Sequence, residues 1–458
     1  MMTKAIVFKG VLLGLAVWSL GSLATARADL LDGQDFAASD STEALMTFKH
    51  RVEFTLPAGK KVSEDVARSK ISSQLNHLFG PMSVARFKAV PKGNEDITNV
   101  SVSRKRGTQR TYIAEYSYRG MIDLQNGAGP TYEIILPINP DRVYYSGIVT
   151  RGDGQKQNVC TDEHYQSRED FWYFWNPAKS GCTLRSGEHY DVVVAEVKRV
   201  PNTKQTYPEY ARLVDSSGTI RIDILMGMND PAELKNPMVS QDVNARNYRA
   251  IRNALMNQMG FSGRVLERGE IRSRSGSARA LPYVEEFVLQ TPKAKVLVNL
   301  FFGQSGMDEP NTAFHYFYKD AVENASVMMY DGHSGLGANL DLEDIESTQD
   351  FEVKLPKNKY QIYYFNSCSS YSYYNTVYFA RKKSKTDPKG TRNLDILTNG
   401  LATYFSVMGE TDLVLVQAIV DWASNKTPAT YQQIATEIDS GNLFGVNGDE
   451  DNPVSISQ

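Results

Sequence analysis

Two short stretches of the sequence run from apolar residues into side chains that can take part in nucleophilic catalysis. VMMYDGHSG, residues 327–335, ends with His333 and Gly335. QIYYFNSCSS, residues 361–370, passes from aromatic residues to Cys368. A thiol with its ordinary pKa of about 8.5 is mostly protonated at neutral pH, and a neighbouring imidazole can accept its proton or stabilise the thiolate. The two residue types therefore predict a Cys–His nucleophile if the fold brings them together.

The surrounding elements are expected to bring them together. Three apolar runs lie at 296–302, 327–330 and 362–365. These runs do not alternate with polar residues, and 312–325 has the spacing of a helix capped by Asn311. Strand–helix–strand order with such runs predicts parallel strands covered on both faces. Groups that follow the carboxyl ends of neighbouring parallel strands share one crevice, so His333 and Cys368 are expected to meet.

The first 28 residues have the pattern of a secretory signal peptide. Lys4 and Lys9 precede an apolar run at 10–23, and Ala26-Arg27-Ala28 is a small-x-small cleavage site. The protein is therefore expected to be exported, to the periplasm or outside the cell, with no integral membrane span after removal of the signal. Removing three basic residues changes the formal charge from −3 to −6, which argues against nucleic acid as a partner.

The chain contains three cysteines, and an odd number leaves one unpaired. Cys160 and Cys182 lie in one segment rich in Gly and Pro, and we expect them to form a disulfide that stabilises the fold by about 3 kcal/mol. With His164 and His189 they could instead hold zinc, but the spacing C-x3-H-x17-C-x6-H matches no common zinc finger. Cys368 is left as the free thiol.

Changes in composition divide the chain into five parts. We expect a signal peptide at 1–28, a linker at 29–46, an α+β N-terminal module at 47–150, an aromatic-rich cross-linked insertion at 151–200, and an α/β domain at 205–458 with its core at 292–458. The aromatic run 171–175 is favoured as the core of the insertion over a sugar- or partner-binding surface. The acidic stretch 448–452 is favoured as a solvated turn over a calcium site. The basic run 381–383 is expected in an exposed loop.

From about residue 292 the order of elements resembles the caspase-like α/β fold of the clan that includes caspases, legumains, gingipains and clostripain. The resemblance lies in a strand ending in His-x-Gly and a strand ending in Ser-Cys. Later segments resemble the family's following helices at 393–405, 414–422 and 431–438, and its closing strand at 444–449.

The resemblance implies that His333 is the general base, that Cys368 is the nucleophile, and that Gly335 forms an oxyanion hole with the Cys368 backbone N–H. Two features exclude a caspase in the narrow sense. Ser334 separates His333 from the glycine, and Asn-Ser-Cys-Ser-Ser replaces Gln-Ala-Cys-x-Gly. A divergent member of the clan is expected.

The expected function is an exported cysteine peptidase that hydrolyses a protein or peptide substrate through a thioester acyl-enzyme, with no cofactor. A transferase or transpeptidase would use the same acyl-enzyme. The alternative is a catalytically inactive, caspase-like secreted or periplasmic binding protein that recognises a protein or glycan, with Cys368 as inert packing. Glu410 and Asp412 are acidic candidates for the specificity pocket, and no feature of the sequence predicts the oligomeric state.

Overall fold

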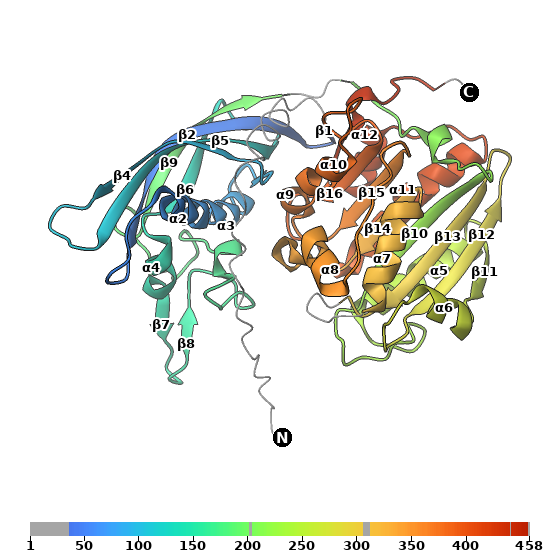
Figure 1. The fold of residues 1–458 in the computed structure, drawn as a ribbon, viewed down its shortest axis with the longest axis horizontal. Coiled ribbons are helices and arrows are strands. Elements are labelled where there is room, and N and C mark those ends of the chain that lie inside the picture. The colour runs from blue at the N-terminus through green and yellow to red at the C-terminus, as the bar shows by residue number, and fades with distance from the viewer. Residues whose placement is uncertain (1–35, 201–203, 306–311, 440, 457–458) are drawn as a thin grey trace.

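The computed structural model describes residues 36–200, 204–305, 312–439 and 441–456. They form two lobes, each built around its own β-sheet (Figure 1). The signal peptide predicted at 1–28 lies outside the described residues, and so does Asn311, the predicted helix cap. In the part of the chain that the structure describes, no helix is long and apolar enough to cross a membrane.

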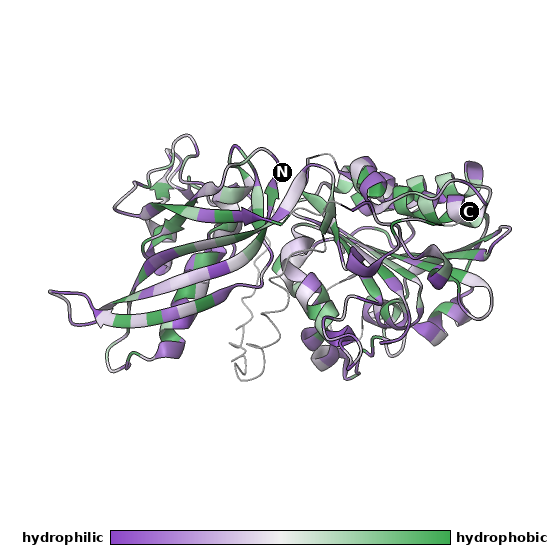
Figure 2. Ribbon diagram, turned by 90° about the horizontal axis from the view of Figure 1, so that it is seen from above, coloured by the Kyte–Doolittle hydropathy of each residue, from purple (hydrophilic) through white to green (hydrophobic). Residues whose placement is uncertain are grey.

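The N-terminal lobe is a six-stranded antiparallel sheet with the order β3-β5-β2-β9-β6, and β4 pairs with β5. Polar and apolar residues alternate along its long strands (Figure 2). In β2, Phe48, Val52 and Phe54 are buried, whereas Lys49 and Arg51 are exposed, which is the period of two that a sheet with one covered face requires. The strands are β2 (Ser41–Thr55), β3 (Ala89–Pro91), β4 (Asp96–Arg104), β5 (Thr111–Gln125), β6 (Thr131–Pro137) and β9 (Tyr190–Arg199).

Helices cover the inner face of this sheet. They are α2 (Glu64–Asn76), α3 (Phe79–Ser83) and α4 (Pro140–Ser146). α2 buries Ala67, Ile71 and Leu75 against the strands. The Ser63 side chain accepts the Val66 N–H at 3.3 Å and caps this helix.

The stretch 29–46, predicted as a linker, contains strands from Phe36 onward, and that prediction was wrong. β1 (Phe36–Ala38) pairs antiparallel with β17 of the other lobe, and β2 begins at Ser41. The chain thus passes from one sheet to the other within a few residues, so no single period appears in the sequence. The polar residue Glu43 is fully buried because a partner, Lys92, lies against it.

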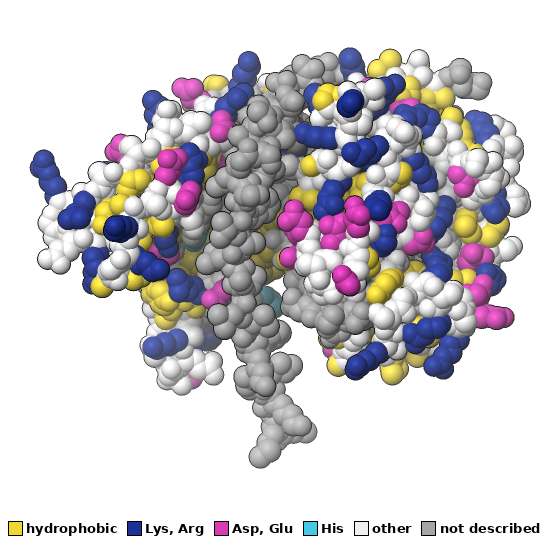
Figure 3. Space-filling view, in the orientation of Figure 1, with side chains coloured by type: hydrophobic (Ala, Val, Ile, Leu, Met, Phe, Trp, Pro, Cys, Tyr) yellow, Lys and Arg dark blue, Asp and Glu magenta, His cyan; other side chains and the backbone are white. Residues whose placement is uncertain are grey.

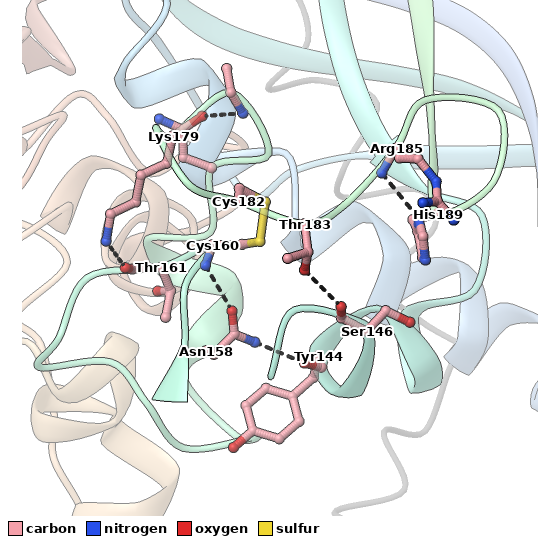
Figure 4. The surroundings of a disulfide bond; sticks show 12 residues. Tyr144, Ser146, Asn158, Cys160, Thr161, Lys179, Cys182, Thr183, Arg185 and His189 are labelled. Carbon is pink, nitrogen blue, oxygen red and sulfur yellow. Dashed lines mark hydrogen bonds between the residues drawn. A yellow bond between two sulfur atoms is a disulfide. The ribbon is translucent and has the colours of Figure 1, made fainter. Parts of the chain in front are cut away.

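The cross-linked insertion was predicted at 151–200, but its last part, β9, belongs to the N-terminal sheet, where it pairs with β2 and β6. The remainder holds β7 (Ile148–Thr150), β8 (Lys156–Asn158) and the short helix η2 (Phe171–Tyr173). Cys160 and Cys182 form the predicted disulfide, with a sequence separation of 22 residues (Figure 4). The two histidines that were considered as zinc ligands have other partners. His164 contacts Asp162, and His189 Nδ1 accepts the Arg185 N–H.

The aromatic run in this insertion forms a core, as predicted. Phe171, Tyr173 and Trp175 are buried, and the Trp175 indole N–H donates to the His77 carbonyl at 2.6 Å. Phe174 is only partly buried and lies at the seam between the lobes.

The C-terminal lobe is a nine-stranded mixed sheet with the order β1-β17-β16-β15-β14-β10-β13-β12-β11. The block from β16 to β13 is parallel, and the outer pairs are antiparallel. The strands after β1 are β10 (Thr219–Gly227), β11 (Ser262–Val265), β12 (Tyr283–Gln290), β13 (Lys295–Gly303), β14 (Val327–Asp331), β15 (Gln361–Asn366), β16 (Leu394–Asn399) and β17 (Phe444–Asn447).

Helices cover both faces of this sheet, as the unalternating strands predicted. α5, α11 and α12 pack into one core, and α7, α8 and α10 pack into the other. The α-helices are α5 (Val243–Asn257), α6 (Arg268–Arg274), α7 (Ala313–Asn324), α8 (Leu342–Gln349), α9 (Ser370–Tyr373), α10 (Asn375–Lys382), α11 (Met408–Ala423) and α12 (Tyr431–Ile438). Short 3-10 helices are η3 (Tyr210–Leu213), η4 (Gly335–Leu340), η5 (Phe405–Val407) and η6 (Asp449–Asp451).

Three local predictions for this lobe were wrong. β10 lies between β13 and β14, so the core of the domain begins at 219 rather than 292. The predicted helix 393–405 contains β16, because the fully buried LDILTN segment is inserted between β15 and β17. The acidic stretch 448–452 is not a solvated turn, because Asp449 is buried and accepts the Thr206 hydroxyl at 2.5 Å.

The basic run 381–383 is also not an exposed loop. Lys382 ends α10 and is buried, with its ammonium donating to Pro356 O at 2.8 Å, Lys359 O at 2.9 Å and Gln361 Oε1 at 2.8 Å. Burial lowers the pKa of Lys382 to about 7. This lysine joins α10 to the start of β15 and is inaccessible to a protease in the folded protein.

Candidate active site

Three neighbouring parallel strands end at the same edge of the large sheet. β10 pairs with β14 and β14 pairs with β15, in a register that places Met226 beside Asp331 and Asp331 beside Asn366. His333 and Cys368 each follow a strand end by two residues. The structure therefore brings the predicted base and the predicted nucleophile to one edge, where the backbone leaves the sheet.

Asn229, just past the end of β10, orients the His333 ring. His333 Nε2 lies 2.7 Å from Asn229 Oδ1, and because a carbonyl oxygen only accepts, Nε2 carries the hydrogen. The neutral ring then has Nδ1 as its basic atom. Phe405 contacts the ring edge-on with centroids 4.8 Å apart, and the Tyr330 hydroxyl donates to the His333 carbonyl at 2.8 Å.

Protein atoms around the His333 ring favour its neutral form. The side chain is exposed at the surface, but partial desolvation lowers the pKa of His333, and the Asp242 carboxylate opposes this change. An imidazole that is neutral at physiological pH can accept a proton, so the protonation state suits a general base.

The Cys368 thiol is partly exposed and points to a backbone acceptor. Its Sγ lies 3.7 Å from the Thr403 carbonyl oxygen, and among the described residues no hydrogen bond joins Sγ to the His333 ring. Burial raises the pKa of the Cys368 thiol above its ordinary value. Burial thus favours the protonated form of the thiol, whose hydrogen-bond acceptor is the Thr403 carbonyl.

The turn after Cys368 is held by both lobes. Ser369 adopts a left-handed conformation with φ of 52°, and the Tyr173 hydroxyl lies 2.6 Å from Ser369 Oγ in a buried contact. The Ser369 amide donates to Leu401 O at 2.9 Å, and Ser370 Oγ donates to Phe365 O at 2.7 Å. The disulfide-bearing insertion therefore supports the loop that carries Cys368.

Gly335 lies in the turn that follows His333. It has φ of 56°, which favours glycine, and it is exposed. The Cys368 amide interacts with the thiol of its own side chain. Ser334 changes the local path of the chain relative to a direct His-Gly sequence.

A buried pair of carboxyl groups lies beneath this edge. Asp331 ends β14 and Asp412 lies in α11, and both are fully buried. Asn366 donates to Asp412 Oδ1 at 3.1 Å. Burial, with added repulsion from Asp412, raises the pKa of Asp331 well above its usual value, and burial raises that of Asp412 to about 6. The pair shares a proton and supports the strand ends, so Asp412 is not available as the predicted specificity residue.

The Asp412 pKa predicts how stability depends on pH. Because the folded state binds the proton more tightly than the unfolded state, the free energy of unfolding falls as pH rises from about 4 to about 6. Asp412→Asn keeps an oxygen for Asn366 and can donate to Asp331. We expect it to flatten this fall and to raise stability at pH 7.5 by about 2–3 kcal/mol. Urea unfolding between pH 4 and 8 measures the free energy of unfolding of both proteins. Asp153→Asn, at an exposed position, is the control. If the free energy of unfolding changes with pH equally in wild type and Asp412→Asn, the prediction is contradicted.

Several residues of this site were not found from the sequence. Asn229, Asp331, Asn366 and Tyr173 carry the contacts just described. Asn229 follows the end of a buried apolar strand, as His333 does, and that position was the available signal. The role of Tyr173 depends on contact between the lobes, which no local pattern indicates.

Comparison with known proteins identifies no relative. No family model matches the sequence, and no curated protein matches it. Among solved structures, the G domain of the T. maritima FeoB iron transporter was matched at 13% identity with a TM-score of 0.21, over 45% of this chain and 99% of that one. A similarity at this level carries no argument about fold or function.

Charges are mixed on the face drawn in Figure 3, where acidic side chains gather over α8 and basic side chains are scattered over both lobes. Within the described residues, no group of three or more His, Cys, Asp and Glu side chains is arranged to hold a metal ion.

Proposed function

We propose that this protein is a cysteine peptidase whose nucleophile is Cys368 and whose general base is His333. The observation that carries the proposal is the convergence of Asn229, His333 and Cys368 at the ends of β10, β14 and β15. A nucleophile, a base and a group that orients the base form the minimum set for acyl transfer. The resemblance to the caspase-like clan supports the same roles, and the signal-like first 28 residues support export.

The chemistry follows from the orientation of the ring. His333 Nδ1 accepts the thiol proton, and the Cys368 sulfur attacks the carbonyl carbon of the scissile peptide bond. The oxyanion accepts hydrogen bonds from the Gly335 and Cys368 amides. The C–N bond breaks as His333 returns the proton to the leaving amine, which leaves a thioester. Water then adds to the thioester with His333 again accepting a proton, and the carboxylic acid and the thiol are released.

One observation favours the alternative, a binding protein without catalytic activity. The Cys368 thiol has a raised pKa and donates to Thr403 O rather than to His333. In unliganded enzymes catalytic hydrogen bonds are often long and form only when substrate binds, so a catalytic Cys368 would exchange Thr403 O for His333 at that point. The two functions differ in the reactivity of the thiol.

Alkylation of the native protein by iodoacetamide across pH 5–10 tests the proposal. Intact-mass analysis of wild type, His333→Ala and Cys368→Ala counts the modified thiols. We expect one alkylation, absent in Cys368→Ala, and a rate at pH 7 that His333→Ala lowers about tenfold or more. Alkylation that requires denaturant, or a pH profile that His333→Ala leaves unchanged, would support the binding protein instead.

A further inference from the structure

The N-terminal lobe is joined to the large domain by buried polar contacts beside the candidate active site. Glu43 Oε1 accepts hydrogen bonds from the Tyr371 hydroxyl at 2.7 Å and from Asn447 at 3.1 Å, both in the large domain. It also accepts one from Lys92 of its own lobe at 2.5 Å. Tyr371 lies three residues after Cys368. β1 also adds an edge strand to the large sheet. Removing the N-terminal lobe would expose Tyr371, Asn447 and the edge of β17 to solvent. The contact between the lobes therefore belongs to the folded structure of the large domain.

A pocket of about 250 Å³ opens at this seam. Phe79, Val84 and Phe174 line it from the N-terminal lobe, and Leu401, Thr403 and Tyr404 line it from the loop after β16. Figure 1 places α3, which carries Phe79, on the side of the N-terminal lobe that faces the large domain. The volume is below the range of about 300–1,000 Å³ typical of pockets for drug-sized ligands, so it suits one side chain of a larger ligand.

The pocket adjoins the candidate nucleophile. The carbonyl of Thr403, a lining residue, accepts the Cys368 thiol at 3.7 Å. On the opposite wall, Phe174 packs against Tyr165 with ring centroids 4.4 Å apart. The candidate nucleophile thus contacts a residue that lines the pocket.

The pocket is expected to disfavour a charged side chain of a ligand. Lys88 is the charged residue of its lining. The Lys88 ammonium already donates to the Gly441 carbonyl at 3.4 Å and interacts with Asp40. Val84 and Tyr404 in the lining are 56% and 77% exposed, so their apolar side chains are accessible from solvent.

From these contacts we infer that the seam pocket binds an aromatic or large aliphatic side chain of the peptide substrate, and that the N-terminal lobe thereby sets specificity. This inference rests on the proposed peptidase function. Val84 and Phe174 are the residues through which the N-terminal lobe acts, because they contribute apolar surface to the pocket without touching the reacting atoms.

Tripeptide acyloxymethyl ketones, which alkylate peptidase thiols, test the pocket in the purified protein. One position of each probe carries Phe, Leu, Asp or Lys, the other two carry Ala, and every position is varied in turn. We expect Phe and Leu at one position to modify Cys368 about tenfold faster or more than Asp and Lys. Val84→Arg should remove this preference. Val454→Arg, at a site that is 59% exposed and outside the pocket lining, should retain it.

Iodoacetamide is too small to need the pocket and reports on the thiol alone. If it labels native Cys368 while the peptide probes show no side-chain preference, or if Val84→Arg keeps the preference, the pocket assignment is overturned and the peptidase proposal stands. If iodoacetamide labels Cys368 only in denaturant, the peptidase proposal fails and the pocket assignment fails with it.

Discussion

Replacing His333 with alanine is expected to slow hydrolysis of a peptide substrate by about 10²–10⁴-fold. The reason is that burial raises the pKa of the Cys368 thiol, so its attack needs a base, and in the proposed function the His333 imidazole held by Asn229 is that base. The loss should lie mainly in kcat, because His333 acts in the transition state rather than in holding the substrate. Fluorogenic peptides that carry an apolar side chain, assayed from pH 5 to 9, measure the effect.

His164→Ala is a matched control, because His164 is also exposed and bonded to one polar partner but lies in the disulfide-bearing insertion. It should leave the rate within about twofold of wild type. Asn229→Ala should give an intermediate loss and a shifted pH profile, since it removes the acceptor that fixes the ring tautomer. Hydrolysis that survives His333→Ala but not Cys368→Ala would show that a different group accepts the proton.

Replacing Lys92 with methionine is expected to lower the free energy of unfolding by about 3–5 kcal/mol. Lys92 and Glu43 are both buried, with side chains 5% and 0% exposed, and removing the ammonium leaves the carboxylate buried without a cation. Two of its hydrogen bonds, from Tyr371 and Asn447, would remain. Urea unfolding at pH 7 followed by tryptophan fluorescence measures the loss.

The double variant Glu43→Gln with Lys92→Met should recover part of this loss, because no unpaired charge stays buried. Lys105→Met is the surface control: its ion pair with Glu53 is 45% and 17% exposed, and its loss should cost less than about 1 kcal/mol. Equal effects of Lys92→Met and Lys105→Met would show that the buried Lys92–Glu43 pair stabilises the fold no more than a surface ion pair does. Because Tyr371 shares Glu43, the alkylation rate of Cys368 should also change in Lys92→Met.

Local sequence was sufficient wherever an element's own residues decide its structure. The helix α12 spans 431–438, the residues at which the resemblance to the caspase-like clan implied a helix. The strands that deliver His333 and Cys368 were predicted because both are buried on two faces and carry continuous apolar runs. The disulfide followed from its position in one loop-rich segment.

Long-range pairing decided the rest. β16 was predicted as a helix, and only its place between β15 and β17 makes it a strand. β10 was left outside the predicted core, whose start at 292 followed the extent of the resemblance. The strands that flank it in the sheet, β13 and β14, come later in the chain. For the same reason the sequence indicated a base and a nucleophile but not Asn229, which depends on the position of β10.

The sequence by itself determined the types of the candidate catalytic side chains and the strands that end beside them, because those strands are recognised from short runs of neighbouring residues. The tertiary structure alone decided the partners of those side chains. Asn229 beside His333, Thr403 beside Cys368, and Tyr173 beside Ser369 are contacts between segments 35 to 196 residues apart. Such contacts form only when whole sheets and lobes pack together. A local pattern of residues does not predict that packing.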